Sequence, residues 1–233
     1  MNENYRIVDS LDSLTRLNIG EGQVGTCYKV NNKVFKKFKS IPRFPGLIMQ
    51  LSNLHSKNFS FPEEFVYLNE HDIKYLQGYL MKYVDGVKVT NISELTKMKE
   101  LCHSLDSLEK EIRTLTEEEN LLVKDLHPDN VLYTDDGKFK VIDTDFCVTY
   151  PDDPVYMYRE NMKELGNCML PVFMGDSNID NSKVKYLYDL CVLDAKAKPS
   201  IVLNEAIEEI QKETKEEVIS LHDFKEGMKL IRK

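Results

Sequence analysis

The sharpest cluster of polar residues in the chain lies between positions 124 and 146. Asp125 is followed five residues later by Asn130, and Asp143 comes directly after the apolar pair Val141-Ile142. A carboxylate such as Asp125 can orient or deprotonate a hydroxyl group. The oxygens of Asn130 and Asp143 are of the kind that Mg²⁺ prefers, and they leave room for phosphate oxygens. The same residue types also form ordinary turns between strands, so the cluster by itself leaves both interpretations open.

A glycine cluster with the spacing G-x-G-x-x-G lies far upstream, at Ile19-Gly20-Glu21-Gly22-Gln23-Val24-Gly25. In dinucleotide-binding proteins this spacing leads directly into a helix. Here residues 26–30 alternate between apolar and polar, which predicts a strand instead. We therefore expect a strand-turn-strand unit whose backbone can close over phosphates. A plain glycine-rich loop is the alternative.

The strand predicted after this unit carries two adjacent lysines, in Val34-Phe35-Lys36-Lys37-Phe38. Because side chains alternate along a strand, Val34 and Lys36 should share one face, and Phe35 and Lys37 the other. A lysine that faces the glycine cluster can neutralise phosphate charge. Taken alone, both lysines are more simply solvated strand residues.

The hydrophobic pattern changes once along the chain, near Asp85-Gly86. Before that point, alternation predicts strands over 14–39, with a tight turn at Asn31-Asn32 because asparagine tolerates positive φ. After it, an apolar stripe from Leu101 to Leu115 predicts a helix over 94–119. This order predicts an α+β fold with a strand-rich first part and a larger helical second part. Further predicted elements are a helix around Leu47, Leu51 and Leu54, a hairpin over 65–84, short strands at 121–124, 130–133 and 139–142, and helices beyond Tyr158.

Taken in order, these motifs resemble those of the protein-kinase-like superfamily. The resemblance covers residues 14–175 and implies a bilobal fold. A small antiparallel-sheet N-lobe would comprise residues 1–85, and a larger helical C-lobe residues 86–233. The matching motifs are Gly20-x-Gly22-x-x-Gly25, Val34-Phe35-Lys36, Asp125-Leu126-x-Pro128-x-Asn130 and Val141-Ile142-Asp143.

The resemblance also implies roles for individual residues, with ATP and Mg²⁺ as cofactors. Asp125 would be the catalytic residue, and Lys36 would contact the ATP phosphates. Asn130 and Asp143 would hold Mg²⁺, with Asp143 rather than Asp145 as the principal acidic ligand. The implied ATP-binding residues are Ile19, Gly20, Gly22, Gly25, Cys27, Val34, Lys36, Met81 and Val84, of which Met81 stands at the gatekeeper position before the hinge.

The chain also departs from the family pattern. Val123-Lys124 replaces the usual His-Arg, and Asp143-Thr144-Asp145 replaces Asp-Phe-Gly. The predicted helix at 45–51 contains no acid to pair with Lys36, which leaves the Gln50 amide or a carboxylate from elsewhere. Glu63 and Glu64 are the candidates considered for that second role. Asn161, which resembles the start of the buried helix after the activation segment, follows Asp143 by only about 18 residues, so there is little room for a regulated loop.

The leading interpretation is a compact, bacterial-type Ser/Thr protein kinase that transfers the γ-phosphoryl group of ATP to a hydroxyl. A small-molecule kinase of the aminoglycoside or choline type is the alternative, because those enzymes often carry a histidine where this chain has His127. A pseudokinase that only binds is a third interpretation. The missing helix acid and the altered Asp-Phe-Gly favour it, whereas the intact set of Asp125, Asn130 and Asp143 opposes it. The acceptor, protein or small molecule, and the oligomeric state stay open.

Composition excludes several other classes of protein. The 233 residues include 39 acidic and 31 basic side chains, which gives a formal net charge of −8. The chain therefore lacks the basic surface of a nucleic-acid-binding protein. It has no apolar run of about 18 residues and no signal-peptide pattern at its start, so we expect no membrane insertion. Five scattered cysteines without a Cys-x-x-Cys pair favour reduced thiols and a cytoplasmic location.

Overall fold

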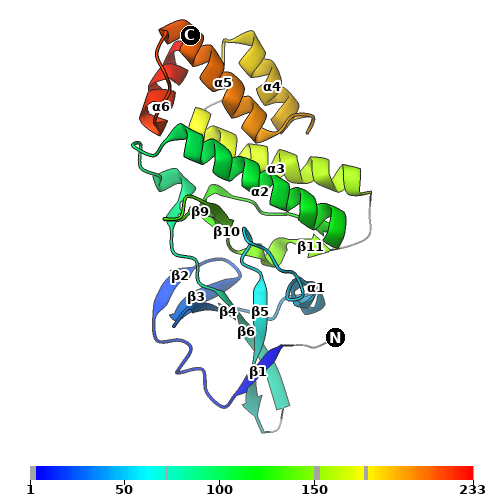
Figure 1. Ribbon diagram of the computed structural model, residues 1–233. Helices are drawn as coiled ribbons and strands as arrows, with labels where there is room; N and C mark the ends of the chain where they lie inside the picture. Colours follow the sequence, from blue (N-terminus) through cyan, green and yellow to red (C-terminus); the bar gives the residue numbers. More distant parts are fainter. Residues whose placement is uncertain (1–3, 72, 150–152, 176–177, 233) are drawn as a thin grey trace.

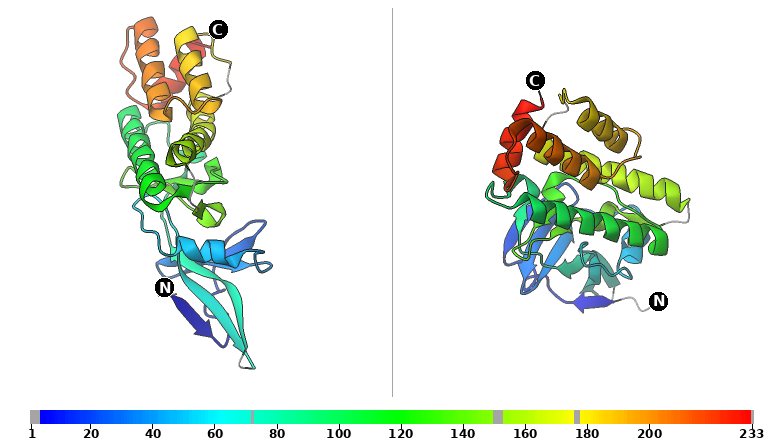
Figure 2. Two further views of the ribbon diagram at one scale, coloured as in Figure 1. Left: turned by 90° about the vertical axis from the view of Figure 1, so that its right-hand side faces the viewer. Right: turned by 45° about the horizontal axis from the view of Figure 1, so that its top comes forward.

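The computed structural model describes residues 4–71, 73–149, 153–175 and 178–232. A β-sheet occupies one end of the molecule and a group of helices the other, with the N-terminus beside the sheet and the C-terminus at the far helical end (Figures 1 and 2). The fold is α+β, as the hydrophobic pattern predicts.

Six strands form one mixed sheet in the order β1-β5-β6-β4-β3-β2. Strands β2 to β6 pair in antiparallel fashion, but β1 runs parallel to β5. The prediction of a wholly antiparallel sheet is therefore wrong at this edge. The chain does not turn back directly after β1. Segment 9–17 instead carries it across the sheet to the opposite edge, where β2 begins. The strands are β1 (Tyr5–Val8), β2 (Asn18–Glu21), β3 (Gly25–Val30), β4 (Lys33–Phe38), β5 (Pro62–Glu70) and β6 (Ile73–Lys82).

Both predicted hairpins are confirmed. Asn31 adopts a φ of 55° in the turn between β3 and β4, in the left-handed region that asparagine tolerates. The β5–β6 hairpin begins at Pro62, three residues earlier than the pattern predicts.

The two faces of the sheet are covered by different segments. On one face, Val34 and Met81 of neighbouring strands pack with Ile48 of the short helix α1 (Pro45–Leu51). On the other face, Phe35 packs with Leu14 from the segment that follows β1. The predicted alternation along β4 is thus confirmed, because Val34 and Phe35 belong to opposite faces.

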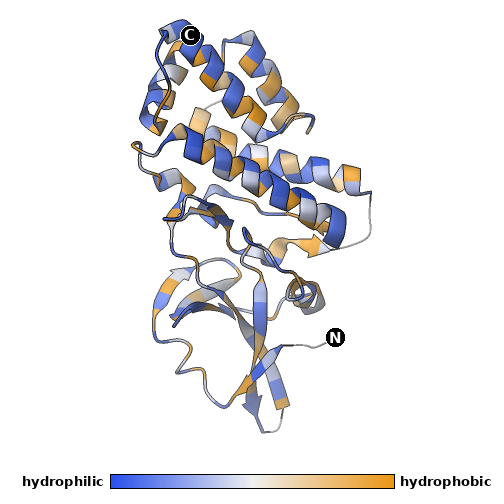
Figure 3. Ribbon diagram, in the orientation of Figure 1, coloured by the Kyte–Doolittle hydropathy of each residue, from blue (hydrophilic) through white to orange (hydrophobic). Residues whose placement is uncertain are grey.

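The helical end is built on α2 (Met98–Glu119) and α3 (Pro154–Met174). The predicted stripe from Leu101 to Leu115 is buried in the largest apolar core, and hydrophilic and hydrophobic residues alternate along α2 in Figure 3. That core also includes Phe59 and Phe61, which lie in the segment between α1 and β5. It therefore reaches across the predicted boundary at residue 85.

The other elements are α4 (Ser182–Val192), α5 (Pro199–Thr214), α6 (Leu221–Leu230), β7 (Val87–Lys88), β8 (Leu121–Leu122), β9 (Val131–Tyr133), β10 (Phe139–Val141), β11 (Val148–Thr149), and the 3₁₀ turns η1 (Val89–Asn91), η2 (Pro128–Asn130) and η3 (Thr144–Phe146).

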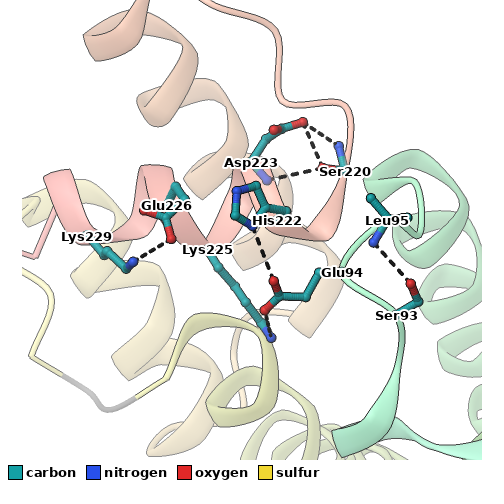
Figure 4. Close-up of polar contacts among 9 residues, drawn as sticks. All are labelled: Ser93, Glu94, Leu95, Ser220, His222, Asp223, Lys225, Glu226 and Lys229. Carbon is teal, nitrogen blue, oxygen red and sulfur yellow. Dashed lines mark hydrogen bonds and ion pairs between the residues drawn. The ribbon is translucent and has the colours of Figure 1, made fainter.

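Two predicted helix starts are wrong. Helix α2 begins at Met98 rather than at residue 94, because residues 94 and 95 form a turn and the chain before the helix is bonded to the start of α6. The backbone N–H of His222 donates to the Glu94 carbonyl (2.8 Å), and the Glu94 carboxylate contacts His222 and Lys225 (Figure 4). Helix α3 begins at Pro154, well before Asn161. The Asp153 side chain caps this start by accepting a hydrogen bond from the Val155 N–H.

The helices give no sign of a transmembrane segment. Within the described ranges, none of them combines the length and the apolar run that crossing a bilayer requires.

Candidate active site

Lys36 lies in the middle of the sheet, on β4 between β3 and β6, and only 3% of it is exposed. Two glycines let the neighbouring strands approach it closely. A Cβ atom at Gly25 would lie 2.5 Å from the Lys37 carbonyl oxygen, and one at Gly78 would lie 2.0 Å from the Lys36 carbonyl oxygen. Gly25 was predicted to lie in the phosphate-binding turn, whereas Gly78 is not among the predicted site residues. The structure gives both glycines a packing role beside Lys36.

The Lys36 ammonium group meets two carboxylates from the segment after β10. It donates to Asp143, and it contacts both carboxylate oxygens of Asp145, at 3.0 and 2.9 Å. Burial would lower the pKa of Lys36, but the two carboxylates outweigh it and raise that pKa, so the lysine is charged. The lysine and the acids lie 107 and 109 residues apart in the chain, and the fold brings them together.

The two carboxylates differ in their surroundings. The Asp145 side chain is 2% exposed, whereas that of Asp143 is 38% exposed. Burial, reinforced by the charge of Asp143, raises the pKa of Asp145 to about 6, although Lys36 acts in the opposite direction. At Asp143 burial also acts to raise the pKa, but the Lys36 charge outweighs it and holds that pKa below its ordinary value. Asp143 is thus an ionised carboxylate that solvent can reach.

The partners considered for Lys36 in the sequence analysis are engaged elsewhere. Gln50 accepts a hydrogen bond from Thr149 Oγ1 at 3.1 Å. Glu63 pairs with Lys33 at 2.9 Å, and Glu64 pairs with Arg6 at 3.0 Å. The expectation that one of these three residues meets Lys36 is wrong. The actual partner, Asp145, stands where the family pattern has a glycine, but that departure alone does not say which residue it contacts.

Asp125 and Asp143 share an unusual backbone conformation. Their φ angles are 58° and 59°, in the left-handed region. Residues other than glycine adopt this region at some energetic cost, and such residues cluster at functional sites. Asp125 itself is exposed.

A buried asparagine holds the chain just before Asp125. Asn161 of α3 accepts a hydrogen bond from the Val123 N–H (2.7 Å) and donates to the Leu121 carbonyl (2.9 Å) and to Thr116 Oγ1 (2.8 Å). No part of Asn161 is exposed. Its three bonds tie the Asp125 loop to α2 and α3, the two helices at the centre of the main core.

Asn130 links the Asp125 loop to the Asp143 segment. Its side-chain amide donates to the Asp125 carbonyl at 3.2 Å, and its own carbonyl accepts from the Ile142 N–H at 2.8 Å. The residue after Ile142 is Asp143, so this backbone hydrogen bond holds the segments that carry the two predicted metal ligands, Asn130 and Asp143, side by side. Within the described ranges, no group of three or more His, Cys, Asp or Glu side chains is arranged to hold a metal ion.

The predicted ATP-binding residues fall on one face of the sheet and at its end. Cys27 lies directly opposite Lys36 on β3, and Val34 lies opposite Met81 on β6. Val34 and Met81 are buried in the same apolar cluster, with Cys27 packed against it. Ile19 on β2 is exposed, and Val84 is half-buried just after β6.

Gly20 and Gly22 differ from Gly25 in their surroundings. A Cβ atom at Gly20 would meet nothing within 4 Å, and one at Gly22 would meet only the Gly25 carbonyl oxygen, at 3.9 Å. Neither glycine has a positive φ. The structure therefore gives neither a packing nor a conformational reason for glycine at positions 20 and 22.

Two cavities of about 630 and 340 Å³ lie away from Lys36, and of the two only the second touches a predicted ATP-binding residue, Val84. The first is bordered by Lys33, Phe61 and Glu63, and the second by Tyr83 and Asp85. Neither of them is lined by Lys36, Asp125 or Asp143.

Comparison with protein-family models and with curated proteins found no match. Function therefore has to be inferred from the site itself.

Proposed function

We propose that the chain is an ATP-dependent phosphotransferase with a kinase-like bilobal fold, in which residues 1–85 form the N-lobe and 86–233 the C-lobe. The observation that carries this proposal is the contact between the buried Lys36 of β4 and the carboxylate of Asp143, which follows β10. A buried charged lysine beside a solvent-accessible acid, at the junction of a sheet and a helical core, suits the binding of phosphates and a metal ion.

The glycine-rich turn supports a role in binding the nucleotide. Because Gly20 and Gly22 have no internal need to lack a side chain, the close approach of a ligand is the remaining physical reason for them. Val34 and Met81, on the same face as Lys36, would offer an apolar surface to the adenine ring.

Asn130 and Asp143 fit a magnesium ion that is bound together with phosphates. They supply one amide and one carboxylate oxygen, a small set that suits Mg²⁺ because this ion usually keeps water and phosphate oxygens as its other ligands. The ion would neutralise charge on the phosphate groups. A site completed by the nucleotide in this way is consistent with the absence of a larger acidic cluster among the described residues.

Asp125 would orient the acceptor hydroxyl and accept its proton. It is exposed, and its loop is fixed by Asn161 and Asn130, so its position does not depend on bound ligand. We place a Ser/Thr hydroxyl of a protein first among acceptors. A small hydroxylated molecule is the second candidate, because His127 is exposed on the same loop and little chain separates η3 from α3.

The test is incubation with γ-labelled ATP and Mg²⁺ in the presence of a generic protein substrate or of a panel of aminoglycosides and choline. We expect label on Ser or Thr of the protein substrate. Label on a small molecule instead would support the second candidate. Binding of ATP without transfer to any acceptor or to water would contradict an enzymatic role and favour the pseudokinase interpretation.

A further inference from the structure

We propose that Asp145 is the positioning residue of Lys36, the role that the resemblance would give to an acid on α1. This inference rests on the proposed function, because it assigns the support of the lysine that would bind the ATP phosphates. The geometry favours Asp145 over every other candidate described above.

Lys36 contacts both carboxylate oxygens of Asp145, and the contact is buried. Both carboxylate oxygens of Asp145 lie within 3.0 Å of the ammonium nitrogen, and both side chains are at most 4% exposed. On the same face of the sheet, Tyr79 lies directly opposite Lys36, where it packs against Phe38 and Phe65. Water therefore has no easy access to this pair.

Asp145 is held by hydrogen bonds of its own turn. It lies in η3, where the Thr144 hydroxyl donates to the Ser60 carbonyl at 3.0 Å and the Cys147 N–H donates to the Thr144 carbonyl at 3.0 Å. Thr144 and Cys147 are each 1% exposed. The position of Lys36 is thus tied to the chain that carries Asp143, whereas α1 contributes no carboxylate to it.

This arrangement separates two tasks between the acids. A buried ammonium that loses its only partner pays a large desolvation cost. Because Asp145 stays with Lys36, Asp143 can turn from the lysine to a metal ion without leaving the lysine unpaired. Without Asp145, Lys36 and Mg²⁺ would compete for the single carboxylate of Asp143.

The first experiment compares the wild-type protein with Asp145→Asn, which keeps the size of the side chain but removes its charge. The Mg²⁺ concentration for half-maximal ATP turnover should rise by on the order of 30-fold, the range found when one partner of a buried charge pair is removed. Gln50→Ala, which alters α1 instead, should leave the Mg²⁺ midpoint unchanged. A role of Asp145 in folding alone would not move this midpoint.

The second experiment uses the ligand-free protein and does not depend on activity. Lys36→Met should lower the unfolding temperature, because it leaves Asp145 buried without its partner. Adding Asp145→Asn to Lys36→Met should recover part of the loss, and this double variant also covers the case in which Asp145→Asn alone does not fold.

The outcomes separate the two proposals. Additive unfolding temperatures would overturn the pairing of Lys36 with Asp145. Coupled unfolding temperatures with an unchanged Mg²⁺ midpoint would overturn the positioning role. A folded wild-type protein that neither binds nor turns over ATP would overturn the proposed function, and with it the role of the pair in catalysis.

Discussion

Lys36 and Lys37 are adjacent in β4 but belong to opposite faces of the sheet. Lys36 reaches Asp143 and Asp145, whereas Lys37 lies half-buried on the face away from them. Lys36→Ala should therefore weaken ATP binding, measured by calorimetric titration with Mg²⁺ present, by about tenfold or more. Lys37→Ala is the matched control and should change the affinity by less than about twofold. Equal losses in the two variants would contradict the assignment of Lys36.

The face of Lys36 could be predicted from the sequence, but its partner could not. Alternation along a strand is a local property, so five residues of β4 suffice to place Lys36 beside Val34. The pairing with Asp145 depends on how η3 docks against Ser60 and the sheet, which no local pattern encodes. The family resemblance predicts that an acid on α1 pairs with the lysine, but α1 contains no acid.

Helices α2 and α5 are joined by a buried carboxylate that is not among the predicted site residues. Glu109 of α2 is fully buried and accepts hydrogen bonds from the backbone N–H and the hydroxyl of Ser200, at 2.6 and 2.7 Å. Ser200 lies in the first turn of α5, so Glu109 satisfies a backbone donor at that helix start. Burial raises the pKa of Glu109 above its ordinary value, and the bonds from Ser200 only partly offset that.

This raised pKa predicts a pH-dependent contribution to stability. The folded state holds the Glu109 proton more tightly than the unfolded state, so the contribution is complete below the unfolded pKa and is lost as pH rises through the folded pKa. Between about pH 4 and pH 7, the free energy of unfolding of Glu109→Gln should therefore rise relative to that of the wild type. Urea unfolding at several pH values measures this, with Glu118→Gln, an exposed site on α2, as control. A difference that stays constant with pH would contradict the assignment.

The elements themselves were largely predictable, and their ends were not. The stripe along α2 follows from spacing alone, because a helix in water must bury its apolar side. The start of α2 is set by a distant partner, since the chain before it bonds to the start of α6, more than 100 residues later. Strand β1 was missed because its four residues form a sheet edge only through pairing with β5.

At the scale of the whole molecule, the order of a sheet followed by helices was predictable, but the packing between them was not. The change of periodicity near residue 85 matches the end of β6 at Lys82. The apolar core nevertheless draws Leu51, Leu54 and Phe59 into the helical end. Cys147, directly after η3, belongs to this shared core, and Asp143 and Asp145 on either side of Thr144 contact Lys36.

The central claim is that this assembled site transfers a phosphoryl group, with Asp125 acting on the acceptor. The most direct measurement is the rate of γ-phosphoryl transfer by Asp125→Asn beside the wild type, with ATP affinity measured on the same samples. Asparagine is nearly the same size and tolerates the left-handed φ of 58°, so the variant should fold. We expect transfer to fall by about 100-fold or more while ATP affinity stays within about twofold. Asp135→Asn, in the exposed turn after β9, is the control and should keep its activity. Unchanged transfer by folded Asp125→Asn would contradict the account.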